Sequence, residues 1–192
     1  ECARCHNNWS GFALGFQPDQ LVSIGGKKPA DSSALFNGPF LERLKNHLIS
    51  SHDAKADLES RARSWLHANC AHCHRRHGGG SVPLMVNADL PTAETMMISE
   101  RPTRGDFSLT DGRVISPRKP EQSVLLARIA RSDSGHMPMI GAREVDPHGF
   151  RVLWDWILGE ATSRAPSKIE SPSDALLLAN AIAKNEVKFD PA

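Results

Sequence analysis

A five-residue pattern, Cys-x-x-Cys-His, occurs twice in this chain of 192 residues, at residues 2–6 and 70–74. Two thiols three residues apart on one helical turn reach the two vinyl groups of one porphyrin, and the adjacent imidazole reaches the iron as its proximal ligand. The two copies use all four cysteines of the chain. The spacing therefore predicts two covalently attached c-type haems. The predicted attachment residues and proximal ligands are Cys2, Cys5 and His6 for haem 1, and Cys70, Cys73 and His74 for haem 2.

Other uses of paired cysteines fit this pattern less well. The two halves of a structural zinc site usually lie roughly 15–20 residues apart, whereas 65 residues separate Cys5 from Cys70. Such a site also has no need of the His that follows each pair. A redox-active Cys-x-x-Cys belongs in a βαβ setting, which neither copy has, and a disulfide framework requires no repeated local spacing.

Composition sets the broad class of the chain. Its length allows one domain or two small ones, and a net charge of +1 offers no argument for nucleic acid or an anionic membrane. No run approaches the roughly 18 apolar residues of a membrane span. Because c-type haem is attached on the outer side of the bacterial inner membrane, we expect a periplasmic or otherwise exported protein. The chain shows no signal peptide and begins one residue before a haem cysteine, which suggests a processed or truncated piece of a larger protein.

Helical periodicity and capping signals divide the chain into short elements. The predicted helices cover about residues 38–50, 57–70, 92–99, 120–131, 146–159 and 173–184. Residues 81–118 are rich in Pro, Gly and Asp and otherwise predict loops. The organisation that follows is a haem 1 segment at 1–56, a haem 2 domain at 57–161, and a linker with a C-terminal helix at 162–192.

Two of these helices have clear inner faces. In the helix at 57–70 we expect Asp57 to be the cap, with an inner face formed by Leu58, Ala62, Trp65, Leu66 and Asn69 and an outer face formed by Glu59, Arg61, Arg63 and Ser64. In the helix at 146–159 we expect Asp146 to be the cap, Pro147 the first residue and Gly159 the end. Its predicted buried stripe is Phe150, Leu153, Trp154 and Ile157.

A Met in a Pro/Gly-rich loop downstream of a haem motif is a candidate distal ligand of the iron. Met137 precedes Pro138 and lies 63 residues after His74, which is enough chain to cross to the other face of a porphyrin. Its thioether is a soft donor that raises the potential of haem iron. Met139 is the alternative, and either Met could instead simply fill a gap in the core.

The distal ligand of haem 1 stays open between three histidines. No Met lies between residues 6 and 85, so a local ligand is one of His47, His52 and His67. After the second motif, Arg75 and Arg76 are candidates to contact haem propionates or a partner, but we interpret them as part of a solvated turn.

Several segments of the chain resemble a known family, beginning with Arg61–His74, Gly78–Gly80 and Val114–Pro117. The similarity continues through Glu121–Leu126, Met137–Gly141 and Trp154–Ile157. The chain resembles the haem domain that closes many large exported bacterial proteins, often behind a β-propeller similar to sugar or aldose dehydrogenases. The resemblance implies a class I cytochrome c fold, His/Met-ligated iron and a role in electron transfer.

The sequence thus predicts a mainly α-helical dihaem c-type cytochrome, with a class I cytochrome c-like helical domain preceded by a short second haem-binding segment. It is expected to carry electrons and not to be an enzyme. The expected partners are a redox donor, possibly a dehydrogenase domain or subunit, and a respiratory acceptor. Two alternatives are a dihaem peroxidase with an open low-potential iron, and a structural or conductive haem subunit of a larger assembly.

Overall fold

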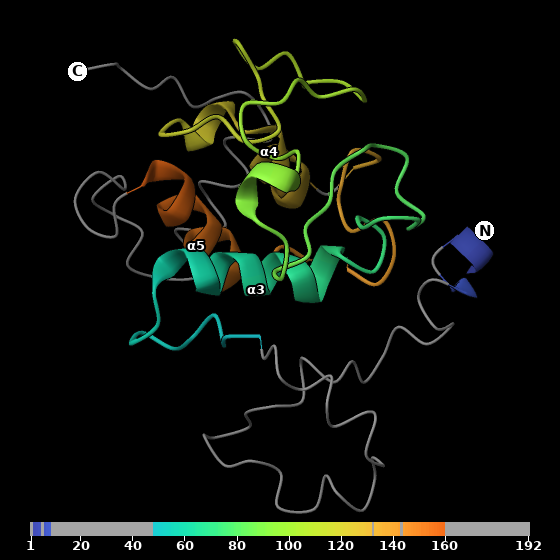
Figure 1. Cartoon of the computed structure of the whole chain (residues 1–192). Helices are drawn as coiled ribbons and strands as arrows, with labels where there is room; N and C mark the ends of the chain where they lie inside the picture. The colour runs from blue at the N-terminus through green and yellow to red at the C-terminus, as the bar shows by residue number, and fades with distance from the viewer. Residues whose placement is uncertain (1, 5, 9–47, 132, 143, 160–192) are drawn as a thin grey trace, which may run out of the picture. The chain divides into compact units, whose positions relative to one another are not determined.

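The computed structural model describes residues 2–4, 6–8, 48–131, 133–142 and 144–159 of the chain. The chain divides into two compact units, Glu1–Glu94 and Thr95–Ala192. This boundary falls inside the segment that the sequence predicts as the haem 2 domain. The described residues form α-helices and short 3-10 helices but no β-strand (Figure 1).

Some sequence predictions concern other residues. The predicted helix at 173–184 and most of the one at 38–50 lie outside the described part of the chain, and residues 48–50 within it are not helical. The class I cytochrome fold remains a prediction.

The first unit contains one α-helix, α3, which spans Leu58–Cys70 among the described residues and confirms the predicted helix. Asp57 caps it, because its carboxylate accepts a hydrogen bond from the backbone N–H of Ser60 at 2.9 Å. This contact with Ser60 lowers the pKa of the Asp57 carboxyl. At the other end, the Ala71 N–H donates to the His67 carbonyl at 3.1 Å. The helix therefore ends with the first cysteine of the second motif.

The inner face of α3 differs in part from the prediction. Its buried residues are Ala62, Ser64, Trp65 and Leu66. The outward placement of Ser64 was wrong, because its hydroxyl accepts a hydrogen bond from the backbone N–H of Ile49 at 2.9 Å. Arg61 also donates two hydrogen bonds, at 2.9 and 2.7 Å, to the carbonyl of Ser51. The segment before the helix thus covers a face that local periodicity assigns to solvent.

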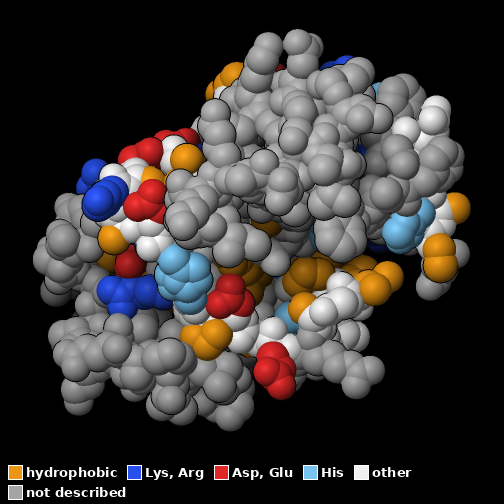
Figure 2. Space-filling model, turned by 90° about the horizontal axis from the view of Figure 1, so that it is seen from below, with side chains coloured by type: hydrophobic (Ala, Val, Ile, Leu, Met, Phe, Trp, Pro, Cys, Tyr) orange, Lys and Arg blue, Asp and Glu red, His pale blue; other side chains and the backbone are white. Residues whose placement is uncertain are grey.

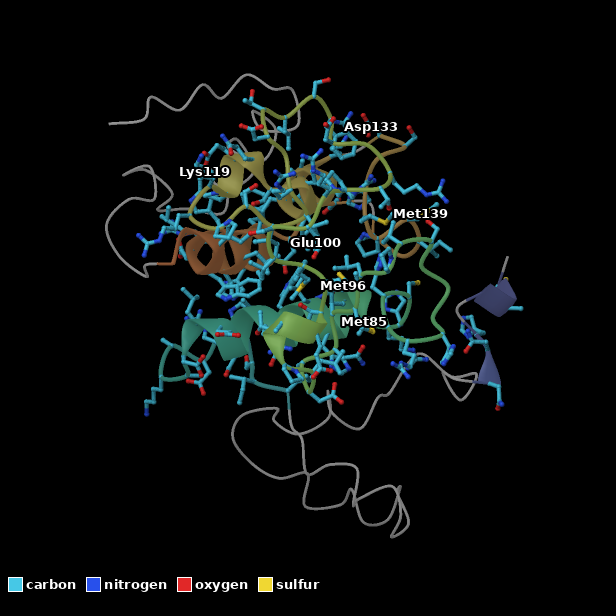
Figure 3. All side chains as sticks on the ribbon, turned by 45° about the horizontal axis from the view of Figure 1, so that its top comes forward. Met85, Met96, Glu100, Lys119, Asp133 and Met139 are labelled. Atoms are coloured by element: carbon cyan, nitrogen blue, oxygen red, sulfur yellow. The ribbon has the colours of Figure 1, made fainter. Side chains whose placement is uncertain are left out.

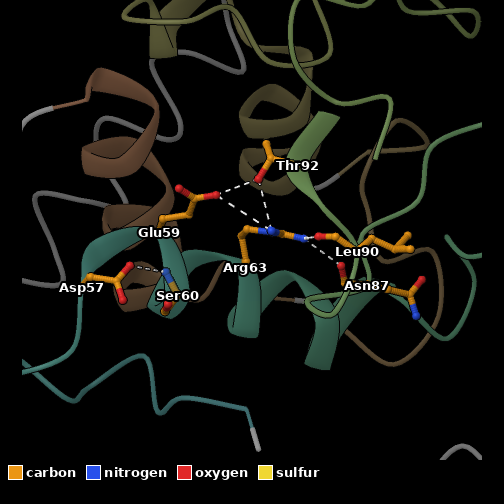
Figure 4. A network of polar contacts seen from close by, with 7 residues as sticks. All are labelled: Asp57, Glu59, Ser60, Arg63, Asn87, Leu90 and Thr92. Atoms are coloured by element: carbon orange, nitrogen blue, oxygen red, sulfur yellow. Dashed lines mark hydrogen bonds and ion pairs between the residues drawn. The ribbon is translucent and has the colours of Figure 1, made fainter. Parts of the chain in front are cut away.

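Arg63 ties α3 to the chain that follows the second motif. Its side chain is only 12% exposed, although the sequence predicts it on the outer face. It donates to the Thr92 hydroxyl at 3.1 Å, to the Asn87 carbonyl at 3.0 Å and also to the Leu90 carbonyl (Figure 4). The Thr92 hydroxyl donates in turn to Glu59 at 2.7 Å.

The second unit replaces one predicted helix with two shorter elements. The 3-10 helix η6 spans Pro120–Gln122 and the α-helix α4 spans Val124–Ala130, so the continuous helix predicted at 120–131 was wrong. Between them Ser123 is extended, because the backbone on either side of it pairs with Arg113. The Arg113 N–H donates to the Gln122 carbonyl at 3.2 Å, and the Val124 N–H donates to the Arg113 carbonyl at 2.8 Å.

The helix α5 spans Pro147–Leu158 and matches its prediction at both ends. The Asp146 carboxylate accepts a hydrogen bond from the His148 N–H at 3.0 Å. At the C-terminal end, Gly159 has a φ of 78°, a left-handed conformation that glycine adopts without a Cβ clash. The predicted stripe is buried as expected: Phe150, Leu153, Trp154 and Ile157. The helix packs against α4 and η6.

The predicted helix at 92–99 is reduced to the 3-10 helix η5, Thr92–Glu94. Beyond it the chain pairs with another segment instead of continuing the helix. The Ile115 N–H donates to the Met97 carbonyl at 3.0 Å, and the Ser99 N–H donates to the Ile115 carbonyl at 2.9 Å. These long-range hydrogen bonds order part of the predicted loop region.

Replacing Phe150 with Ala should destabilise the second unit strongly. The Phe150 side chain is fully buried, and its ring lies 6.0 Å from that of Trp154. Truncating such a ring leaves a cavity and typically costs about 3–5 kcal/mol. Urea unfolding of the purified protein measures the change. Arg151→Ala, on the outer side of the same helix, is the control, and an equal loss for both variants would contradict the assignment of the core.

The outer surface carries both signs of charge. On the face shown in Figure 2, Lys and Arg side chains of the described residues are interspersed with Asp, Glu and hydrophobic ones. In the described part of the chain, no helix has the length and apolar character needed to cross a membrane.

Candidate haem site

The second Cys-x-x-Cys-His motif forms one tight turn at the end of α3. The N–H groups of Cys73 and His74 both donate to the Cys70 carbonyl, at 3.1 and 2.9 Å. The turn thus brings Cys73 and His74 close to Cys70 along the backbone. This is the backbone arrangement that the spacing predicts.

The first motif shares one hydrogen bond with the second. Its first residues form the 3-10 helix η1, Cys2–Arg4, and the His6 N–H donates to the Cys2 carbonyl at 2.9 Å. The equivalent hydrogen bond in the second motif, from His74 to Cys70, has the same length. Cys5 lies outside the described residues. In both motifs, therefore, the backbone N–H of the His reaches the carbonyl of the first Cys.

The chain after the second motif folds back onto it through two glycines. The Gly80 N–H donates to the Cys73 carbonyl at 3.0 Å, and the Val86 N–H donates to the His74 carbonyl at 2.9 Å. A Cβ atom on Gly78 would lie 2.2 Å from the Cys73 carbonyl oxygen, and one on Gly80 would lie 3.0 Å from the His74 Nδ1 atom. Glycine is therefore required for the backbone to approach this closely.

Gly78→Ala should disturb this turn, because the added Cβ meets a backbone oxygen that cannot swing away. Overpacking of this kind typically costs about 1–3 kcal/mol of the free energy of unfolding, which urea titration measures. Gly80→Ala should cost less, since its closest contacts are at 3.0 Å, and Ser81→Ala, at an exposed position of the same loop, should be neutral. A neutral Gly78→Ala would show that the loop does not approach Cys73 as described.

Burial controls the state of the first thiol in the second motif. It raises the pKa of Cys70 to about 12, and the nearby Cys73 adds to this rise. The thiol of Cys70 is therefore protonated at neutral pH. The thiolate is the form of a cysteine that attacks another sulfur, so the raised pKa makes Cys70 a weaker nucleophile than an ordinary thiol. None of the described cysteines (Cys2, Cys70 and Cys73) is in a disulfide.

Arg75 follows His74 and differs from its neighbour Arg76. Arg76 is exposed, as expected of a solvated turn, whereas Arg75 is half-buried. The Nε and Nη2 atoms of Arg75 are buried and have no hydrogen-bond partner among the described residues. Its charge also reaches His72, whose pKa is lowered first by burial and then by Arg75. The prediction of a solvated turn is therefore wrong for Arg75. Such a guanidinium fits an anionic group such as a carboxylate.

The candidate distal Met lies in the second unit, in the loop after α4. Met137 is half-buried, its N–H donates to the Arg128 carbonyl at 3.0 Å, and its peptide bond to Pro138 is cis. Met139 is 75% exposed, and Figure 3 shows its side chain on this loop. Both ring nitrogens of the preceding His136 are buried without a hydrogen-bond partner among the described residues. The loop thus offers one half-buried Met with an anchored backbone and one largely exposed Met.

The three candidate histidines for haem 1 differ in exposure and in hydrogen bonding. His47 lies outside the described residues, and His52 is exposed. The Nδ1 atom of His67 accepts a hydrogen bond from the Ala88 N–H at 3.1 Å. An imidazole that accepts at Nδ1 carries its proton on Nε2, which then cannot bind a metal. This hydrogen bond disfavours His67.

Sequence reasoning missed two features of the site. The run Gly78–Gly80 enters the sequence analysis only as part of a family resemblance, although three successive glycines soon after the second motif are a signal of close backbone approach. The unpartnered nitrogens of Arg75 and His136 have no sequence signal, because burial of a charged or polar group depends on chain segments far away.

Comparisons with protein families, with curated proteins and with solved structures find no match to this chain. Within the described part of the chain, no group of three or more His, Cys, Asp or Glu side chains is arranged to hold a metal ion.

Proposed function

We propose that this chain is an exported dihaem c-type cytochrome that carries electrons between a dehydrogenase or similar donor and a respiratory acceptor. The observation that carries the proposal is the repeated turn. Two Cys-x-x-Cys-His segments use all four cysteines, and in both the His N–H donates to the carbonyl of the first Cys at 2.9 Å. A bound haem supplies an iron that gains and loses one electron.

The residues around the second motif fit a haem. Cys70 and Cys73 would hold it by thioether bonds, each formed when a thiol adds its sulfur to one vinyl carbon and its proton to the other. His74 would bind the iron, and the partnerless buried nitrogens of Arg75 would bind a propionate carboxylate.

The distal ligands are proposed from residue chemistry. For haem 2 we propose Met137, because it is half-buried and its backbone is anchored to α4, whereas Met139 is largely exposed. For haem 1 we propose His47 or His52 ahead of His67, since the hydrogen bond from Ala88 occupies His67.

Replacing His47, His52 and His67 by Ala one at a time tests the haem 1 ligand. Only one variant, His47→Ala or His52→Ala, should convert one haem from low-spin to high-spin, because the iron loses its sixth ligand. Electron paramagnetic resonance of the oxidised protein detects this change. A change in the His67 variant alone would contradict the ranking, and no change in any variant would mean an open site or a ligand from elsewhere.

The electron-carrier function is tested by giving the reduced protein two oxidants separately. We expect rapid, salt-dependent reoxidation by an oxidised small cytochrome, and negligible turnover of hydrogen peroxide, because two fully ligated irons leave no position for a substrate. Stopped-flow absorbance follows both reactions. Fast catalytic consumption of peroxide together with a high-spin haem 1 would establish a peroxidase instead.

A further inference from the structure

The loop that carries Met137 is fastened to α4 by one residue. The side chain of Arg128 donates to the Gly135 carbonyl at 3.2 Å, and the backbone carbonyl of Arg128 accepts a hydrogen bond from the Met137 N–H at 3.0 Å. Arg128 therefore holds the loop through both its side chain and its main chain, on the two residues that flank His136.

The same guanidinium fixes a second segment. Its Nη2 atom donates to the Arg104 carbonyl at 2.6 Å, and its Cζ atom lies 4.8 Å from the ring centroid of Phe107. Because an arginine has a rigid, planar set of donors, these contacts set the position of the guanidinium between residues 104–107 and the Met loop.

The ring of Phe107 also contacts Arg131 and Gly135. The Cζ atom of Arg131 lies 4.4 Å from the centre of its ring, and a Cβ atom on Gly135 would lie 2.8 Å from its Cε1 atom. The φ of Phe107 is 57°, a conformation that is rare for a bulky residue and persists only where the surroundings impose it. The ring thus forms a wall against which Gly135 packs.

The two arginines on one ring repel each other, and Asp133 offsets this. Its carboxylate accepts a hydrogen bond from the Arg131 Nε atom at 2.7 Å and one from the Gly135 N–H at 2.9 Å. These hydrogen bonds, that from Arg131 first, lower the pKa of Asp133 to about 2. Asp133, labelled in Figure 3, is therefore ionised at neutral pH. Its hydrogen bond from the Gly135 N–H is a further contact that fixes the start of the loop.

We propose that Arg128 and Phe107 are positioning residues that clamp the loop 133–137 and present the Met137 thioether to haem iron. The proposal rests on the proposed function, in which Met137 is the distal ligand of haem 2. The clamp favours the Met-bound state, because a loop held in advance loses less conformational freedom when its thioether binds the iron.

The test measures how easily an added ligand displaces the thioether. Imidazole competes with Met for oxidised iron, so a loosened loop should raise the affinity of the holoprotein for imidazole. For Arg128→Ala we expect a rise of about 10- to 100-fold, equal to about 1.4–2.8 kcal/mol, in line with the loss of charge-assisted hydrogen bonds. Arg128→Lys retains the charge but not the planar donors, and should show most of this rise.

Arg104→Ala is the matched control. It removes an exposed cation but leaves the backbone carbonyl to which Arg128 donates, so its imidazole affinity should stay within about twofold of the wild type. An equal rise in Arg104→Ala and Arg128→Ala would overturn the clamp in favour of a general charge effect. No rise in either Arg128 variant would overturn it as well.

Two further measurements separate this proposal from the proposed function. Covalent haem content and the Fe–S charge-transfer band are recorded for the wild type first. Absence of haem, or of the band, overturns the proposed function or the Met137 assignment, and with it the role of the clamp at the iron. Where both are present, hydrogen exchange of the Met137 N–H, which should be about tenfold faster in Arg128→Ala, shows whether the loop itself is loosened. Unchanged exchange would count against the clamp.

Discussion

Oxidised Met137→Ala should lack the weak near-red charge-transfer band that marks a bond between iron and a Met sulfur. Without the thioether, haem 2 should also lose part of its midpoint potential, within the roughly 0.8 V range over which axial ligands set haem potentials. Absorbance spectroscopy measures the band and a redox titration measures the potential. Both effects should be confined to one of the two haems.

Met139→Ala is the matched control for this variant. It removes a thioether two residues away that is 75% exposed, and it should leave the band and both potentials unchanged. If Met139→Ala abolishes the band and Met137→Ala does not, the distal ligand is Met139. In that case the loop would have to bring an exposed side chain onto the iron, and the anchoring of Met137 by Arg128 would have another role.

Replacing Cys70 and Cys73 together by Ala should remove half of the covalent haem. The variant Cys70→Ala/Cys73→Ala retains His74, so haem 2 would have a ligand but no thioether bond, and it would be lost on denaturation. Intact mass under denaturing conditions should fall by the mass of one haem, beyond the small change in the side chains. A pyridine haemochrome assay should give one covalent haem per chain instead of two.

The double variant Cys2→Ala/Cys5→Ala is the counterpart of this experiment. It should also retain one covalent haem, but this haem should be haem 2, so the charge-transfer band between iron and the Met sulfur should still be present. A wild-type chain with a single haem, lost only in Cys70→Ala/Cys73→Ala, would reduce the protein to a monohaem cytochrome. A wild-type chain with none would contradict the haem proposal entirely.

Features that depend on neighbouring residues along the chain could be predicted from the sequence. Asp57 caps α3, and α5 begins after Asp146 and ends at Gly159, as expected. In both Cys-x-x-Cys-His motifs the His N–H donates to the carbonyl of the first Cys, a contact that the local spacing predicts. In each case the stabilising partner lies within a few residues, so propensity, capping and periodicity carry the information.

Features that depend on distant segments could not be predicted. The buried Ser64 accepts a hydrogen bond from Ile49, and the helix at 120–131 breaks at Ser123 because the backbone there pairs with Arg113. Arg128 donates both to the Gly135 carbonyl and to the Arg104 carbonyl. The sequence by itself determined where the two Cys-x-x-Cys-His motifs lie and that the helix α3 leads into the second of them. Only the tertiary structure decided which charged side chains are drawn partly out of solvent, because the half-buried positions of Arg75 and Arg128 depend on chain segments that meet only after folding.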